Sequence, residues 1–307
     1  MRRRRALALA AALPAAIAGL PGLARARSAV RRSLAFDSPS LGRPMAYSLY
    51  LPDGYDPAGP PLSVIYLLHG LGGGETDWLD AGGLRATADR LIAEGALPPA
   101  IVVMPDGDDG WYVDAPDGAG RYERAVLVDL PAHVEATLAA RTDRAGRAIA
   151  GLSMGGFGAL RLAMHHPERY VAAASLSGAL FPPGTYEDAA TADMPPRLFR
   201  GAFGTPFDRT RLRRASPFAA IDALAARRAA GEPVPALYLT TGDDDYFGFE
   251  KGAMRLYLTL EAAGLPAEIR VTDGDHVWPL WRAELPAALA FLGRALADGP
   301  DAAPGRE

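Results

Sequence analysis

A serine lies between two glycines in the segment 151–155, whose sequence is GLSMG, after a short apolar run and before a helix-like pattern. A strand that reverses sharply into a helix crowds its backbone, so the residues on either side must be small while the serine Oγ stands exposed at the tip. Ala150 and Gly156 extend this small surround. The segment therefore predicts a nucleophilic serine, Ser153, at a strand-to-helix turn.

A histidine and three adjacent aspartates follow later predicted strands. Asp243, Asp244 and Asp245 come after residues 236–241, and His276 comes after residues 267–272. A serine hydroxyl is a weak nucleophile until a base takes its proton, and imidazole titrates near neutrality. An aspartate can hold the imidazole tautomer and stabilise the imidazolium. We therefore expect Ser153 as nucleophile, His276 as base and one of the three aspartates as acid. Asp243 follows the strand too closely to be favoured.

A glycine-rich loop, HGLGGG, occupies residues 69–74 after another predicted strand. Glycines let backbone N–H groups approach a substrate, so the amides of Leu71 and Met154 are the predicted oxyanion hole. We expect His69 to brace this loop and, with Gly70, to lie close to the substrate. Aromatic side chains could form a rim for a sugar or phenolic group. They are Trp111, Tyr112, Trp278 and Trp281.

The remaining histidines and acidic clusters have simpler interpretations. His165 and His166 fall in the last turn of a predicted helix, where they would meet carbonyl groups, and His133 is expected to be a packing or surface residue. The acidic run 106–109 and the three aspartates lack the full spacing of a calcium loop, and no histidine pair suggests zinc. We therefore expect neither a metal nor a cofactor, and assign the run 106–109 to a pocket wall.

These residues must be positioned by a sheet. Runs rich in β-branched and aromatic residues predict eight strands, and most of the later ones are separated by helix-like segments. The strands are expected at 33–37, 45–51, 62–68, 100–104, 146–150, 171–176, 236–241 and 267–272, and helices at 83–95, 123–140, 156–166 and 282–297. Such alternation predicts an α/β fold with a doubly wound, mostly parallel sheet, in which active-site residues gather at the carboxyl ends of the strands.

A longer insert at about 178–235 interrupts this alternation. It carries two proline pairs and a predicted helix start at Ser216-Pro217. Its place between the sixth and seventh strands is where a lid over an active site would lie. The alternative is a surface segment that does not cover the site.

Composition limits the class of protein. The chain has 307 residues, 49% of them hydrophobic, enough for one α/β domain. The net charge is -4, so the chain has no excess of positive charge that would favour binding to nucleic acid. The absence of cysteine excludes disulfides and a thiol nucleophile. The sequence gives no indication of the oligomeric state.

The N-terminus resembles an export signal. Four arginines, an apolar run and Ala24-Arg25-Ala26 fit a signal peptide over residues 1–26, although a membrane anchor is the alternative. We expect a hydrolase domain at 27–297, a disordered tail at 298–307, a periplasmic or secreted protein, and no stable membrane insertion after processing.

Taken together, these motifs resemble the esterase family that includes esterase D, feruloyl and acetyl-xylan esterases and mycolyltransferases. The residues that carry the resemblance are His69 to Gly73 with Trp78, Met104 to Gly107 with Trp111-Tyr112, Gly151 to Gly156, and His276-Val277-Trp278 with Trp281. The resemblance implies the α/β-hydrolase fold, with its order Ser, Asp, His. The family's Gly-x-x-Asp-aromatic segment falls on 242–246, which favours Asp245.

The expected function is serine-dependent hydrolysis of carboxylic esters of a small molecule or carbohydrate, through an acyl-enzyme on Ser153. An acyltransferase that passes the acyl group to a sugar hydroxyl is one alternative. A non-catalytic binding protein on the same scaffold is another, because fold alone does not guarantee chemistry.

Overall fold

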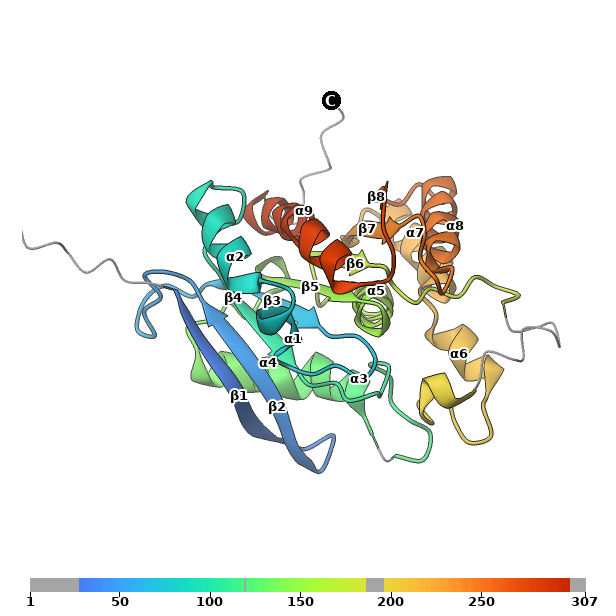
Figure 1. Cartoon of the computed structure of the whole chain (residues 1–307), viewed down its shortest axis with the longest axis horizontal. Coiled ribbons are helices and arrows are strands. Elements are labelled where there is room, and N and C mark those ends of the chain that lie inside the picture. The colour runs from blue at the N-terminus through green and yellow to red at the C-terminus, as the bar shows by residue number, and fades with distance from the viewer. Residues whose placement is uncertain (1–27, 119, 186–195, 299–307) are drawn as a thin grey trace, which may run out of the picture.

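The computed structural model describes residues 28–118, 120–185 and 196–298 (Figure 1). Eight strands form one sheet in the order β1-β2-β4-β3-β5-β6-β7-β8. β2 pairs antiparallel with β1 and β4, and the other neighbours pair in parallel. This confirms the predicted mostly parallel eight-stranded sheet. The strands are β1 (Ala29–Ser38), β2 (Arg43–Leu51), β3 (Ser63–Leu68), β4 (Ala100–Pro105), β5 (Arg147–Leu152), β6 (Ala172–Leu176), β7 (Ala236–Gly242) and β8 (Ala267–Thr272).

The central strands are buried on both faces. In β3, Val64 and Tyr66 belong to one hydrophobic cluster, while Ile65 and Leu67 belong to the other. Side chains alternate between the two faces of a strand, so a continuous apolar run is what a sheet covered on both sides requires. The apolar sequence of β3 thus follows directly from its position in the sheet.

Helices cover the two faces of the sheet. The buried residues of α1 (Asp77–Asp80), α2 (Leu84–Ala93) and α9 (Trp278–Asp298) form one cluster with the sheet, and Figure 1 shows α2 beside α9. Those of α4 (Leu130–Thr137), α5 (Met154–His165) and α8 (Phe249–Ala262) form the other. The predicted doubly wound arrangement is therefore confirmed.

The helix expected at 123–140 is interrupted. It consists of α3 (Tyr122–Arg124), a π-helical turn at Ala125–Asp129 and α4. Pro131 explains the change, since its missing N–H and its ring disfavour a regular hydrogen bond to the preceding turn. α8 was not among the predicted segments. Gly252 weakens its helical pattern, and a Cβ there would come within 2.0 Å of the Leu180 carbonyl oxygen.

The insert between β6 and β7 is partly described. It contains short 3-10 turns at Pro196–Phe199 and Pro217–Ala220, with α6 (Arg209–Ala215) and α7 (Ile221–Ala229). The helix start expected at Ser216 is confirmed, because its Oγ accepts a hydrogen bond from the Phe218 N–H. A further 3-10 turn, Arg144–Gly146, precedes β5.

Both predicted terminal segments fall largely outside the described residues. The signal peptide at 1–26 lies wholly outside them, and so does the tail beyond Asp298, where α9 ends. Among the helices that the structure describes, none is both long and apolar enough to cross a membrane.

Candidate active site

Ser153 lies at a sharp turn between β5 and α5. The strand ends at Leu152, the helix begins at Met154, and Ser153 itself has φ 53° and ψ -118°. Such a conformation costs a non-glycine residue about 1–3 kcal/mol, so the surrounding structure must enforce it. The Ser153 N–H donates to the Leu176 carbonyl at 2.9 Å, and the Ser153 carbonyl accepts from Ala179 N–H at 3.0 Å. These bonds hold the turn against β6.

The glycines around Ser153 are required by contact distances. A Cβ on Gly151 would lie 2.4 Å from the Gly155 carbonyl carbon, and one on Gly155 would lie 2.5 Å from the His69 carbonyl oxygen. A Cβ on Gly156 would lie 2.7 Å from the Ser175 Oγ. The turn can pack against β3 and β6 because these residues lack side chains.

Ser153, His276 and Asp245 are joined by two hydrogen bonds. His276 Nε2 lies 2.9 Å from Ser153 Oγ, and His276 Nδ1 lies 2.8 Å from Asp245 Oδ2. Since a carboxylate accepts, Nδ1–H donates to Asp245 and Nε2 is left to accept from the serine hydroxyl. Asp243 and Asp244 are exposed and do not reach His276; the Asp243 carboxylate accepts from Gly274 N–H instead.

A fourth carboxylate connects the loops that carry Asp245 and His276. Asp275 Oδ1 accepts from the His276 N–H at 2.6 Å and from the Tyr246 N–H at 3.0 Å. This role of Asp275 was not predicted from the sequence. Its position directly before His276 is the one signal available, because the second partner lies 29 positions earlier in the chain.

Aromatic rings surround the imidazole of His276. The Phe247 and Trp281 ring centroids each lie 5.0 Å from it, and those of Phe249 and Tyr246 lie 5.4 and 5.8 Å away, all edge-to-face. This packing limits rotation of the ring, so His276 is held toward both of its partners.

Two backbone N–H groups predicted to form an oxyanion hole lie beside Ser153. Met154 is the first residue of α5, and such an N–H has no acceptor within its own helix. In the described part of the chain, no hydrogen bond from Leu71 N–H to a protein acceptor is found. Both residues line the same cavity as Ser153.

That cavity has a volume of about 550 Å³. Of the residues predicted to contact substrate or to form the aromatic rim, Gly70, Trp111, Trp278 and Trp281 line it. Leu198 and Ala179 of the insert line it too. Three exposed apolar side chains also line it, and these were not predicted. They are Tyr246, Phe247 and Val277.

His69 and Tyr112 do not line the cavity, so their expected contact with substrate is corrected. Both are almost completely buried. The Nδ1–H of His69 donates to the Gly70 carbonyl at 2.7 Å, and its Nε2 accepts from Gly107 N–H at 2.8 Å. The Tyr112 hydroxyl donates to the His69 carbonyl at 3.1 Å. The expected bracing contact of His69 is present, and packing into the loop is what removes both side chains from the cavity.

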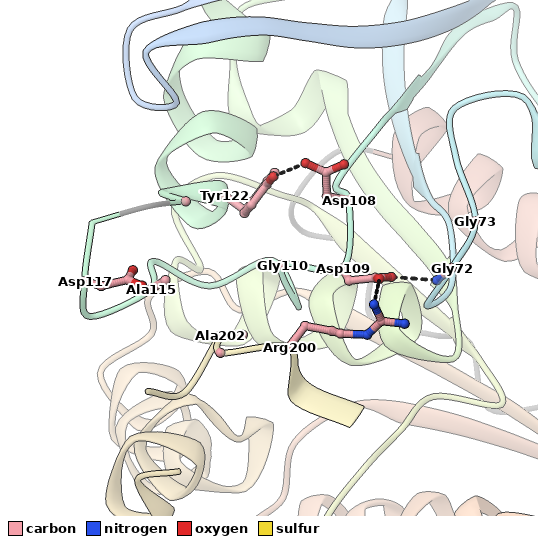
Figure 2. Close-up of a pocket in the computed structure, with 12 residues that line it drawn as sticks. Gly72, Gly73, Asp108, Asp109, Gly110, Ala115, Asp117, Tyr122, Arg200 and Ala202 are labelled. Atoms are coloured by element: carbon pink, nitrogen blue, oxygen red, sulfur yellow. Dashed lines mark hydrogen bonds and ion pairs between the residues drawn. The ribbon is translucent and has the colours of Figure 1, made fainter. Parts of the chain in front are cut away.

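A second cleft, of about 540 Å³, is lined in part by Gly72 and Gly73 of the glycine-rich loop (Figure 2). Gly73 lines both spaces, but the second contains none of the groups of the Ser153 arrangement. Asp108 and Asp109, from the acidic run 106–109, line it. Elsewhere, carboxylate oxygens of Asp243, Asp244 and Asp273 lie within 4.8 Å of one another, but all three residues are exposed. Exposed acidic groups alone do not identify a metal site.

The other histidines contact protein groups away from the cavity. His133 stacks on Phe36 and hydrogen bonds with the Tyr47 hydroxyl, and burial lowers its pKa. His165 Nε2 lies 3.0 Å from the Ser216 carbonyl, and burial lowers its pKa as well. His166 meets the Glu123 carboxylate at 2.9 Å rather than a carbonyl group.

Comparison with known proteins finds relatives that are named as esterases or acyltransferases. The chain is 29% identical over 279 residues to Esterase Rv1288 of Mycobacterium tuberculosis, covering 84% of this chain and 58% of that protein. It is 32% identical over 198 residues to the diacylglycerol acyltransferase/mycolyltransferase Ag85B of Mycolicibacterium smegmatis, covering 59% and 56% of the two chains. It thus spans just over half the length of these curated relatives.

Similar solved structures include an esterase as well. A ferulic acid esterase superimposes with a TM-score of 0.71 at 26% identity, covering 88% of this chain and 99% of that one. The chain therefore has the α/β-hydrolase fold. The model of the family described as Putative esterase matches residues 38–292, which is most of the sequence and the whole of the sheet beyond β1. The chain belongs to this esterase family.

Proposed function

We propose that the protein is a serine esterase that hydrolyses carboxylic esters through an acyl-enzyme on Ser153. The observation that carries the proposal is the continuous hydrogen-bonded series from Ser153 Oγ through His276 to Asp245, beside a cavity of about 550 Å³. Membership of an esterase family supports the same reaction class.

In the first half-reaction, Ser153 Oγ attacks the ester carbonyl carbon while its proton passes to His276 Nε2. Asp245 stabilises the imidazolium through its bond with Nδ1–H. The Leu71 and Met154 N–H groups donate to the oxyanion, each contributing about 3–4 kcal/mol by comparison with related sites. The intermediate collapses when His276 protonates the departing alcohol.

In the second half-reaction, an acceptor attacks the acyl-enzyme carbonyl carbon and His276 removes its proton. The bond from the acyl carbon to Ser153 Oγ then breaks, and His276 returns the proton to Ser153. Water gives hydrolysis, whereas a sugar hydroxyl gives acyl transfer, the activity named for the Ag85B relative. Comparing product ratios in buffer and in sugar-supplemented buffer separates the two. We favour an ester of a small molecule or carbohydrate, because the cavity is lined by aromatic and apolar side chains together with a few polar ones, Asp77, Ser153 and His276.

Replacement of Ser153 tests the proposal. Ser153→Ala should retain less than about a tenth of wild-type turnover of a p-nitrophenyl ester, since the acyl-enzyme cannot form. The wild type should also be labelled at Ser153 by a fluorophosphonate probe. An unlabelled, inactive wild-type protein would instead support a binding protein on this scaffold.

We also propose that residues 1–26 are an export signal, that 27–297 form the hydrolase domain, and that the insert acts as a lid. The basic start and the Ala24-Arg25-Ala26 site support export. The cavity contacts of Ala179 and Leu198 support the lid.

A further inference from the structure

Two loops meet around the predicted oxyanion donor Leu71. We define the oxyanion loop as residues 69–74 and the bracing loop as residues 106–112. On one side of Leu71, the bracing loop contacts His69 through the Gly107 N–H and the Tyr112 hydroxyl. On the other side, the Gly72 N–H donates to Asp109 Oδ1 at 2.7 Å. The residue that would bind the oxyanion is thus held from both directions by one loop.

We propose that Asp109 is a positioning residue, whose carboxylate fixes Gly72 and thereby orients the neighbouring N–H of Leu71 toward the oxyanion. The proposal rests on the proposed function. It assigns to Asp109 no contact with substrate, because its role is exerted through Gly72.

The surroundings of Gly72 make this hydrogen bond important. Gly72 is exposed, has φ +72°, and a Cβ placed on it would meet nothing within 4 Å. Packing therefore does little to hold this residue in its left-handed conformation. A hydrogen bond from an N–H to an ionised carboxylate is roughly twice as strong as one between neutral groups. Asp109 supplies that bond from 37 positions away in the chain.

Asp109 also contacts the insert. Its Oδ2 lies 3.6 Å from Nη1 of Arg200, whose side chain is 62% exposed (Figure 2). Exposed ion pairs contribute little, about 0–1 kcal/mol. The bond to Gly72 should therefore dominate. An asparagine keeps an acceptor oxygen but loses the charge, so it should retain part of the effect that an alanine loses entirely.

Asp108 provides a matched control in the same cleft. Its carboxylate contacts the Tyr122 hydroxyl and the Arg43 guanidinium, and Figure 2 shows it directed to Tyr122 rather than to Gly72. Replacing Asp108 removes a charge from the same loop and leaves the Asp109 contact with Gly72 in place.

The test compares Asp109→Ala, Asp109→Asn, Arg200→Met and Asp108→Ala with the wild type, using p-nitrophenyl acetate. Asp109→Ala should lower kcat about tenfold to a hundredfold, less than or equal to the loss of a whole oxyanion donor, with KM changed less than about threefold. Asp109→Asn should lose less, about threefold to tenfold, because its neutral oxygen still accepts from Gly72 but more weakly. Arg200→Met and Asp108→Ala should each stay within about threefold of wild-type kcat. Labelling by a fluorophosphonate should slow in parallel with kcat, because the phosphonyl oxygen occupies the same place.

Hydrogen exchange gives a readout that does not depend on catalysis. Asp109→Ala should speed amide exchange in a peptide covering residues 69–74, whereas Asp108→Ala should not. If Asp109→Ala does not fold, Asp109→Ser replaces it, because its hydroxyl is too short to reach Gly72.

Three kinetic results would overturn the proposal: unchanged kcat in Asp109→Ala, equal losses in Asp109→Asn and Asp109→Ala, or a loss in Asp108→Ala equal to that in Asp109→Ala. Unchanged exchange over residues 69–74 would overturn it as well. Full activity of Ser153→Ala would contradict the proposed function and not the role of Asp109. In that case, the exchange measurement still decides whether Asp109 holds the oxyanion loop.

Discussion

Three adjacent aspartates near His276 differ in what their side chains reach. The Asp245 carboxylate is buried and meets Nδ1 of His276, whereas those of Asp243 and Asp244 are exposed. Side-chain direction changes with each step along a loop, so a shift of one residue removes the contact. This difference predicts very unequal effects of the same substitution at the three positions.

Asp245→Asn should lower kcat by on the order of 10⁴-fold, because the amide keeps the shape but cannot stabilise the imidazolium. Asp243→Asn and Asp244→Asn are the matched controls and should each cost less than about tenfold, or roughly 1.4 kcal/mol of barrier. Steady-state kinetics with one p-nitrophenyl ester measures all three. A severe loss in Asp244→Asn with a mild one in Asp245→Asn would contradict the assignment.

Sequence patterns identified some site residues better than others. Ser153 was recognisable because small residues must surround such a turn, and His276 because it follows a strand end. His69 and Tyr112 were assigned to substrate contact, yet both are buried, since a motif gives proximity to a site without giving the direction of a side chain. Asp109 could not be found, because its partner Gly72 is distant in sequence and the two are joined by the fold alone.

At the scale of elements, close packing between α5 and β3 supports the turn at Ser153. A Cβ on Gly155 would lie 2.5 Å from the His69 carbonyl oxygen and 2.6 Å from that of Leu68. Backbone atoms cannot yield as a flexible side chain can, so the helix would have to move away from the strand and from the oxyanion loop.

Gly155→Ala should therefore destabilise the fold by about 1–3 kcal/mol and lower activity as well. Gly74→Ala is the control, because a Cβ there meets nothing within 4 Å. Urea unfolding measures stability, and p-nitrophenyl ester turnover measures activity. Equal stability of the two variants would argue against the close approach.

A partly buried carboxylate joins α3 to the end of α5. Glu123 accepts from Arg161 Nη2 at 2.6 Å and meets His166 Nε2 at 2.9 Å. Burial raises the pKa of Glu123, but the hydrogen bond with His166 and the charge of Arg161 outweigh it and lower the pKa to about 2. Because this value lies below the ordinary 4.5, the ionised form stabilises the folded protein fully above about pH 4.5, and this contribution is lost as the pH falls toward 2.

Glu123→Gln should accordingly lower stability at pH 6, and the difference from wild type should shrink between about pH 4.5 and 2. The difference in urea midpoint across this range is the measurement. Glu94→Gln, which removes an exposed pair with Arg90, should have little effect at any pH. A pH-independent difference for Glu123→Gln would show that the lost charge is not the cause.

Some helices and strands were easier to predict from the sequence than others, and the difference has a physical cause in each case. β3 and β4 were clear because strands buried on both faces are continuously apolar. The π-helical turn before Pro131 was missed, since it depends on how one proline is accommodated within a helix. α8 was missed because Met254 and Leu258 are exposed, which obscures the apolar stripe of an otherwise amphipathic helix.

At the scale of the whole molecule, Ser28, the first residue that the structure describes, is well anchored. Ser28 is 5% exposed; its Oγ donates to Asp89 at 2.8 Å, and its carbonyl accepts from Arg85 at 2.5 Å. These contacts join the start of β1 to α2 without any residue before Ser28. Cleavage after Ala26 would therefore leave them intact.

The protein recovered from native expression should accordingly begin near Arg27 and be found outside the cytoplasm. Mass spectrometry of the purified chain and of cell fractions gives both results. A version starting at Arg27, expressed directly, should unfold within about 2 °C of the full-length chain, because the contacts that join β1 to α2 begin at Ser28. Recovery of an intact chain from Met1 in the cytoplasm would contradict export. A large loss of stability in the Arg27 version would instead mean that residues before Ser28 support the fold.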